Sequence, residues 1–209
     1  MNRGRDDPRG PGRPAGRLDP NRPVDILFVC TGNICRSPMA QQLLLAALGT
    51  GPDAARYRVT SAGTHGYDGQ DMDPPAAAEL RRLGGVSAGF RSRALTDRAC
   101  EAADLILTAT REQRSIVLDR VPSALRRSFT LLEFAQSIQA LPTVPMAGNN
   151  PVMWIPIIAA ERGNHRFASY DVTDPYRGTA DVHRHVADTI LGAVDIIAAQ
   201  LRTPPPGPH

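Results

Sequence analysis

The stretch FVCTGNICRSPMAQQLL (28–44) holds two cysteines, an arginine and a Ser-Pro pair within residues 30–38. It overlaps a nearly continuous apolar run, VDILFVC (24–30), which is typical of a strand buried in a parallel sheet. It leads into SPMAQQLLLAAL (37–48), where Ser-Pro predicts a helix start and apolar residues recur at helical spacing. The stretch therefore predicts a strand, a tight loop and a helix N-terminus in direct succession.

A junction of this kind is a natural anion site, because loop N–H groups and the positive end of the helix dipole converge on it. Cys30 would face that field, which favours the thiolate, a strong nucleophile at neutral pH. Arg36 offers a planar fork that matches two oxygens of a phosphate. Gly32 and Asn33 suit a tightly curled backbone, and Ser37 can bond to the sulfur. The loop therefore predicts nucleophilic chemistry on a tetrahedral oxyanion.

The loop differs from the nucleotide-binding Walker loop. The chain has no G-x-x-x-x-G-K-[ST] pattern and contains no lysine, which excludes nucleotide hydrolysis of that kind. A bare C-x5-R motif is weak evidence, since a buried structural cysteine followed by a surface arginine has the same spacing. The accompanying Gly, Asn and Arg-Ser-Pro, with a strand before and a helix after, favour the phosphate loop.

Strand and helix patterns alternate along the rest of the chain. Further strands are expected at YRVTSAG (57–63), DLILTAT (104–110) and the start of SFTLLEFAQSI (128–138). Helices are expected at 73–84, 111–121 and 181–201, and in the second part of 128–138. This alternation predicts an α/β domain built on a parallel sheet.

Composition divides the chain into three parts. Residues 1–23, rich in Pro, Gly and Arg, are expected to be a disordered basic extension, and 203–209 (TPPPGPH) a disordered tail. The domain is expected to cover 24–202. Residues 139–170 contain four prolines and the only tryptophan, and they resemble an insertion, with 152–160 as a short helix or hairpin arm. The insertion is either a lid, a partner or dimer contact, or a segment packed on its own domain.

Charge and cysteine content limit the functional classes. The net charge of +3 resides in residues 1–23, which carry six arginines and three acids, while the remainder is balanced. No nucleic-acid partner is therefore expected. Three cysteines are too few for a secreted disulfide scaffold, and no apolar stretch suits a signal peptide or a membrane span. We expect a cytoplasmic protein.

Two motifs at opposite ends of the domain carry a family resemblance. FVCTGNICRSPMA (28–40) resembles the N-terminal signature V-C-x-G-N-I-C-R-S-P of the low-molecular-weight protein tyrosine phosphatases. TDPYRG (173–178) resembles the C-terminal D-P-Y/F motif of that family, and VTSAGTHGYDG (59–69) resembles its S-A-G-T stretch. The resemblance implies a single doubly wound α/β domain with a four-stranded parallel sheet, flanking helices and a phosphate loop after the first strand. It also implies no metal and no other cofactor.

The resemblance implies hydrolysis of phosphotyrosine in a protein substrate through a cysteinyl-phosphate intermediate. Cys30 attacks phosphorus, Arg36 holds the equatorial oxygens, and Asp174 protonates the leaving phenolate and then activates water. The phosphate-binding residues implied are Thr31, Gly32, Asn33, Ile34, Cys35, Arg36 and Ser37.

Other positions match family residues with supporting roles. Tyr67 and Tyr176 match the aromatic walls of the substrate cleft, and Ser61 matches a serine that bonds the loop asparagine, Asn33. Cys35 either packs against the loop or forms a reversible, protective disulfide with Cys30. A zinc role is disfavoured, because two thiols without nearby His or Cys cannot complete a site.

Two positions depart from the family pattern. Arg177 stands where the family often has a second aromatic residue, and Thr110 replaces an acidic residue that is common after the third strand. These departures concern substrate preference, and Arg177 favours an acidic or doubly phosphorylated partner.

Three alternative functions remain open at this point. Arsenate reduction would use Cys100 as a relay thiol, although a second relay thiol is missing. Phosphoarginine hydrolysis belongs to a branch that has threonine where Ile34 stands, and Ile34 favours phosphotyrosine. A non-enzymatic phosphoprotein-binding module would be expected to lose Cys30, Arg36 or Asp174, and all three are present.

Overall fold

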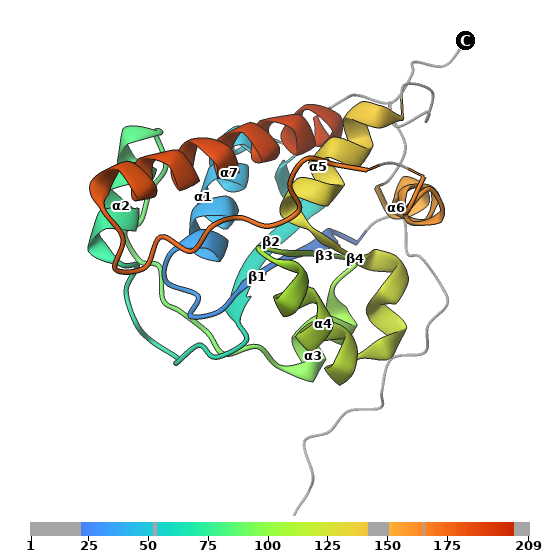
Figure 1. Ribbon diagram of the computed structural model, residues 1–209, viewed down its shortest axis with the longest axis horizontal. Helices are drawn as coiled ribbons and strands as arrows, with labels where there is room; N and C mark the ends of the chain where they lie inside the picture. Colours follow the sequence, from blue (N-terminus) through green and yellow to red (C-terminus); the bar gives the residue numbers. More distant parts are fainter. Residues whose placement is uncertain (1–21, 52–53, 142–150, 165, 203–209) are drawn as a thin grey trace, which may run out of the picture.

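The first predicted strand lies at the centre of the sheet. The computed structural model describes residues 22–51, 54–141, 151–164 and 166–202. Its four strands are all parallel, in the order β2-β1-β3-β4 (Figure 1). They are β1 (Val24–Cys30), β2 (Tyr57–Gly63), β3 (Leu105–Thr108) and β4 (Ser128–Thr130). The expected α/β fold with a four-stranded parallel sheet is confirmed.

The continuous apolar pattern of β1 follows from this central position. All seven of its residues are buried, because neighbours cover both edges and helices cover both faces. β1 pairs with β2 along its whole length, so that Cys30 lies opposite Gly63. The register therefore delivers the first loop cysteine to the carboxyl edge of the sheet.

Helices cover the sheet on both faces (Figure 1). On one face α7 packs against α1, α2 and α5, and on the other α3 and α4 pack with the 3-10 turn η2. The buried side chains accordingly form two core clusters, one on each face of the sheet. The bounds are α1 (Arg36–Leu48), η1 (Ala54–Arg56), α2 (Pro74–Arg82), α3 (Asp97–Ala102), α4 (Arg111–Arg120), η2 (Pro122–Arg127), α5 (Leu131–Ala140) and α7 (Ala180–Leu201).

The expected insertion contains helix α6 (Pro151–Ala160), which lies beyond the β4 edge of the sheet (Figure 1). Trp154, Ile155 and Ile158 are almost fully buried, and the Trp154 ring stacks on Phe134 with 5.8 Å between centroids. These apolar side chains therefore extend the core of their own chain. Ile157 remains partly exposed. Residues 142–150 and 165 of the insertion lie outside the described residues, as do 1–21 and 203–209 of the two expected tails.

Capping explains where several elements begin. Thr110 and Thr130 each form a capping box with a residue three positions on, so that β3 and β4 give way sharply to α4 and α5. The predicted strand at 104–110 is therefore shorter than expected, because its last residue serves as the helix cap. Within the described residues, no helix is long and apolar enough to cross a membrane.

Candidate active site

The loop between β1 and α1 is held by one buried amide. Asn33 adopts φ 55°, a left-handed conformation that asparagine tolerates better than most residues. Its Nδ2 donates to Ser37 Oγ and Ser61 Oγ, both at 2.8 Å, and its Oδ1 accepts from the Arg93 N–H at 2.8 Å. Ser61 is thus hydrogen-bonded to Asn33, the pair expected to support the loop. Every hydrogen-bonding atom of the amide side chain is used to hold the loop against its surroundings.

Replacing Asn33 with alanine is expected to lower the free energy of unfolding by about 2–4 kcal/mol, because three hydrogen bonds, two of them buried, are lost and a strained φ remains. Urea unfolding monitored by circular dichroism measures this change. Asn33→Gly is the matched control, since it loses the same bonds but tolerates positive φ, and should recover about 1 kcal/mol. Equal stability of the alanine variant and the native protein would contradict this account of the loop.

The Cys30 thiol is surrounded by polar groups. Its Sγ accepts from the Asn33 N–H at 3.3 Å and lies 3.0 Å from Ser37 Oγ. Hydrogen bonds to the sulfur, together with the N-terminus of α1, stabilise a negative charge there. A close backbone approach completes the loop: a Cβ on Gly63 would lie 2.6 Å from Thr31 O, so that position requires glycine.

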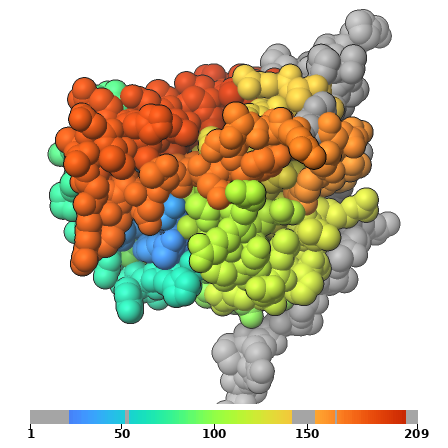
Figure 2. Space-filling view, viewed as in Figure 1, coloured from blue at the N-terminus to red at the C-terminus, as the bar shows by residue number. Residues whose placement is uncertain are grey.

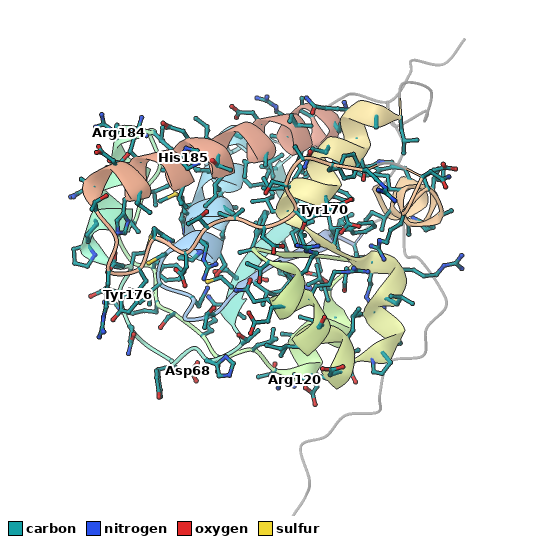
Figure 3. The ribbon with its side chains drawn as sticks, in the orientation of Figure 1. Asp68, Arg120, Tyr170, Tyr176, Arg184 and His185 are labelled. Carbon is teal, nitrogen blue, oxygen red and sulfur yellow. The ribbon has the colours of Figure 1, made fainter. Side chains whose placement is uncertain are left out.

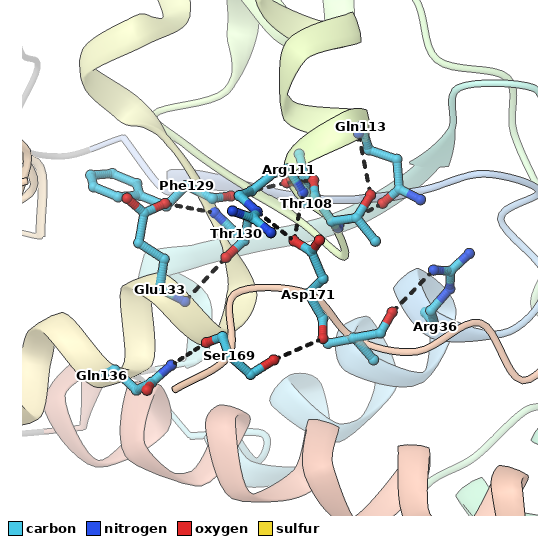
Figure 4. Close-up of polar contacts among 12 residues, drawn as sticks. Arg36, Thr108, Arg111, Gln113, Phe129, Thr130, Glu133, Gln136, Ser169 and Asp171 are labelled. Carbon is cyan, nitrogen blue, oxygen red and sulfur yellow. Dashed lines mark hydrogen bonds and ion pairs between the residues drawn. The ribbon is translucent and has the colours of Figure 1, made fainter. Parts of the chain in front are cut away.

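Arg36 is buried at the first position of α1, and its guanidinium joins three segments. Nη1 donates to Val172 O at 3.2 Å, as Figure 4 shows, and Nη2 lies 2.7 Å from the Asp174 carboxylate. Nη2 also donates to Thr31 Oγ1 at 3.4 Å. The remaining donor, Nε, is buried and has no partner among the described residues. The fork is therefore fixed in position while its Nε has no acceptor among the described residues.

Asp174 lies at the open side of the loop. Its side chain is 52% exposed, whereas that of Arg36 is 5% exposed, so the pair spans the boundary between interior and solvent. Its Oδ1 accepts from the Tyr176 N–H at 3.2 Å. The structure thus brings Cys30, Arg36 and Asp174 to one site from opposite ends of the domain.

Two exposed tyrosines belong to segments that border the loop. Tyr67 is 75% exposed and Tyr176 is 49% exposed. Figure 2 shows the loop at the bottom of a hollow bordered by the segments that carry these residues. In Figure 3, Tyr176 marks one of these segments, and Asp68, the residue after Tyr67, marks the other. The Arg177 guanidinium lies 5.2 Å from the centre of the Tyr176 ring. Ile34 is half-buried, and its carbonyl accepts from the Asp73 N–H at 2.9 Å.

The pKa values of Cys35 and Cys100 are both raised by their surroundings. Burial, and then the negative charge of Asp73, hold the pKa of Cys35 far above its usual value. Burial raises the pKa of Cys100 to about 11. Among the described residues, no three His, Cys, Asp or Glu side chains cluster as metal ligands would.

Besides the Arg93 N–H, sequence reasoning missed three residues that support the site. Gln113 is buried and its Nε2 donates to Thr31 Oγ1 at 3.1 Å, while Gln41 Oε1 accepts from Ser61 Oγ at 2.6 Å. Val172 contributes only its carbonyl. The T-x-x-Q spacing that ends at Gln113 is a capping-box signal, so that residue was detectable as a cap. Nothing local identifies the other two, because their roles depend on segments distant in the chain.

The fold is that of an α/β protein, and the loop at the carboxyl edge of its parallel sheet is a candidate anion-binding site. A sequence model described as low molecular weight phosphotyrosine protein phosphatase matches residues 25–145, more than half of the chain. The chain belongs to the low-molecular-weight phosphotyrosine protein phosphatase family, and is a phosphatase of that family.

Relatives of two specificities resemble the chain. A protein-arginine-phosphatase of Geobacillus stearothermophilus is 28% identical over 181 residues, which cover 87% of this chain and 98% of the relative. The probable low molecular weight protein-tyrosine-phosphatase EpsP of Ralstonia nicotianae is 38% identical over 177 residues, covering 85% and 95%. The solved structure of the YwlE arginine phosphatase from Geobacillus stearothermophilus superposes with a TM-score of 0.65 at 28% identity, covering 87% of this chain and 94% of that one.

Proposed function

We propose that the protein is a protein tyrosine phosphatase that hydrolyses phosphotyrosine in protein substrates without a metal. The observation that carries the proposal is the convergence of a thiol, a guanidinium fork and a carboxylate on one anion-binding loop. Cys30 Sγ attacks phosphorus as the bond to the phenolic oxygen breaks, and Asp174 supplies a proton to that oxygen. Water then attacks the cysteinyl-phosphate, Asp174 accepts its proton, the S–P bond breaks, and inorganic phosphate leaves.

Arg36 and the backbone N–H groups of residues 31–36 bind the equatorial oxygens, where charge resides in the transition state. The buried Nε without a protein partner supports this role, since an oxyanion supplies the missing acceptor. A phosphoryl group competes with Asp174 for Arg36 Nη2. We infer that substrate binding shifts the carboxyl group from the fork toward the leaving oxygen.

Three residues support tyrosine over arginine as the phosphorylated side chain. Ile34 places apolar surface at the loop, where the phosphoarginine branch has threonine. Tyr67 and Tyr176 offer two exposed rings that suit a flat phenyl group. The second candidate is phosphoarginine hydrolysis, which is favoured by the full-length similarity to the protein-arginine-phosphatase.

Arsenate reduction has less support. Its relay thiol would be Cys100, which is fully buried in the core cluster on the α3 and α4 face of the sheet. Cys30 packs in the cluster on the other face. Burial also raises the pKa of Cys100 to about 11, which disfavours the attacking thiolate.

A partner or dimer contact through 139–170 stays a prediction. Three of the apolar side chains of α6 that suggested it, those of Trp154, Ile155 and Ile158, are buried inside the chain. Ile157 is exposed on α6 and is the apolar side chain to test for such a contact.

Comparing kcat/KM for matched phosphotyrosine and phosphoarginine peptides tests the specificity. The native protein is expected to prefer phosphotyrosine by at least about tenfold. Ile34→Thr is expected to shift the ratio toward phosphoarginine by about tenfold, because the apolar contact with the phenyl ring is lost and a hydrogen-bonding group is gained. Ile34→Val is the control and should change the ratio little. A native preference for phosphoarginine would overturn the tyrosine assignment and leave the phosphatase chemistry intact.

A further inference from the structure

A second cleft lies between α4, α5 and the chain that follows α6. Its cavity has a volume of about 200 Å³, and its lining includes three arginines: Arg111, Arg114 and Arg162. Phe167 and Tyr170 contribute an aromatic wall. Cys30, Arg36 and Asp174 do not line this cleft. The cavity is large enough for a carboxylate or a phosphate group.

The arginines in the cleft are crowded. Arg114 Nε and Arg162 Nη2 donate to the same acceptor, Ser128 O, at 2.9 and 2.6 Å. Burial, and then the positive charge of Arg114, lower the pKa of Arg162. Two guanidinium groups held at one carbonyl repel each other, and an anion bound between them would relieve that repulsion.

Charge pairing leaves one of the three arginines without a carboxylate. Arg162 Nε pairs with Glu133 at 3.0 Å, and Arg111 Nε lies 3.4 Å from Asp171. Arg114 has no carboxylate partner within the described part of the chain, and Ser128 O is the acceptor recorded for it there. Glu161 also lines the cleft, where its carboxylate accepts from Asn164 Nδ2 at 2.7 Å. The terminal nitrogens of Arg114 are therefore the donors available to an incoming anion.

One short segment connects this cleft to the candidate active site. Tyr170 lines the cleft, Asp171 accepts from the Arg111 N–H at 2.9 Å, and the Val172 carbonyl binds Arg36 (Figure 4). Asp174 follows two residues later. Four residues of extended chain span at most about 14 Å. The Cα atoms of Tyr170 and Asp174 therefore lie within about 14 Å of each other, a separation that a few residues of an extended substrate peptide would span.

We infer that the cleft is a second subsite, which recognises an acidic group on the same substrate polypeptide. The group is a carboxylate or a second phosphate, and Arg114 is its principal ligand. The inference rests on the proposed function in that the substrate is a phosphoprotein. Part of the 139–170 segment would then contribute to substrate choice, because Arg162, Phe167 and Tyr170 line the cleft.

The test compares three phosphotyrosine peptides of equal length. One has neutral flanks, one carries glutamates within four residues on either side, and one carries a second phosphotyrosine in that window. The native protein is expected to show about tenfold higher kcat/KM on both acidic peptides than on the neutral one. A gain on the doubly phosphorylated peptide alone would also support the subsite and identify phosphate as its ligand.

Arg114→Met is expected to remove most of this preference and to leave p-nitrophenyl phosphate turnover unchanged. The fold should persist, because Ser128 O retains its bond from Arg162. Arg114→Lys should recover part of the preference, and Glu161→Gln should increase it about twofold by removing a repelling charge. Arg120→Met is the matched control, since Arg120 lies on the same helix but pairs with Asp97 at 2.7 Å outside the cleft.

Two results would overturn the inference. One is a native protein that hydrolyses all three peptides equally well, which would leave phosphotyrosine hydrolysis itself established. The other is an Arg114→Met variant that keeps the acidic preference or loses activity equally on all three peptides. Loss of turnover on every phosphotyrosine substrate by the native protein would instead count against the proposed function.

Discussion

Replacing Cys30 with serine is expected to reduce kcat for p-nitrophenyl phosphate by at least about 10⁴-fold, because a hydroxyl is a far weaker nucleophile than a thiolate. The polar contacts at this position favour the charged sulfur: Asn33 N–H donates to Sγ, and Ser37 Oγ lies 3.0 Å away. A serine hydroxyl gains much less from the same donors. Initial rates in buffer containing EDTA measure the loss and test metal independence together.

The serine variant should keep its fold, since oxygen replaces sulfur in a site that already hydrogen-bonds. Thermal unfolding of the two proteins checks this. Cys100→Ala is the control for removing a buried thiol elsewhere, and it should retain native turnover because Cys100 packs in the other core cluster. Substantial turnover by Cys30→Ser would assign the nucleophile to a different residue.

Replacing Asp174 with asparagine is expected to lower kcat for phosphotyrosine by about 10²–10⁴-fold, because an amide cannot donate a proton to the leaving oxygen or accept one from water. The ion pair with Arg36, at 2.7 Å, positions this carboxylate at the loop. The loss should be smaller on p-nitrophenyl phosphate, because nitrophenolate leaves without much help from an acid. Parallel measurements of kcat/KM on the two substrates isolate the acid step, because kcat/KM covers only the steps up to release of the phenolate and leaves out hydrolysis of the shared cysteinyl-phosphate.

Asp181→Asn supplies the matched control, since Asp181 is an exposed carboxylate in the first turn of α7. It should leave both rates near native. An Asp174→Asn variant with equal losses in kcat/KM on both substrates would indicate that the residue positions Arg36 and donates no proton to the leaving oxygen. In that case another group would have to protonate the phenolate.

Local sequence patterns predicted most of the fold. The apolar run at 24–30 predicted a buried strand of a parallel sheet, and the structure has one with those bounds, at the centre of the sheet. The alternation of strands and helices predicted a parallel sheet, because the connection between two parallel strands needs a crossover. The short apolar run at 152–160 fits either a helix or a hairpin arm, and the structure has a helix there.

The candidate site also has a part that local sequence predicts and a part that depends on distant segments. Cys30, Arg36 and the loop between them are close in the chain, so their types and spacing already predict an anion site. The network around Asn33 was only partly predictable. Ser61 was expected from the resemblance, whereas the Arg93 backbone donor was not. Gln41, Gln113 and Val172 reach the site from separate elements.

The sequence by itself determined the strand, the loop and the helix start, because those depend on hydrogen bonds and dipoles between neighbouring residues. It also determined which chemical groups the loop carries. Only the tertiary structure decided that the chain 136 residues beyond Arg36 returns to bind its guanidinium. Packing of distant segments likewise buried the apolar face of α6 and formed the arginine cleft, and no local pattern encodes contacts between residues so far apart.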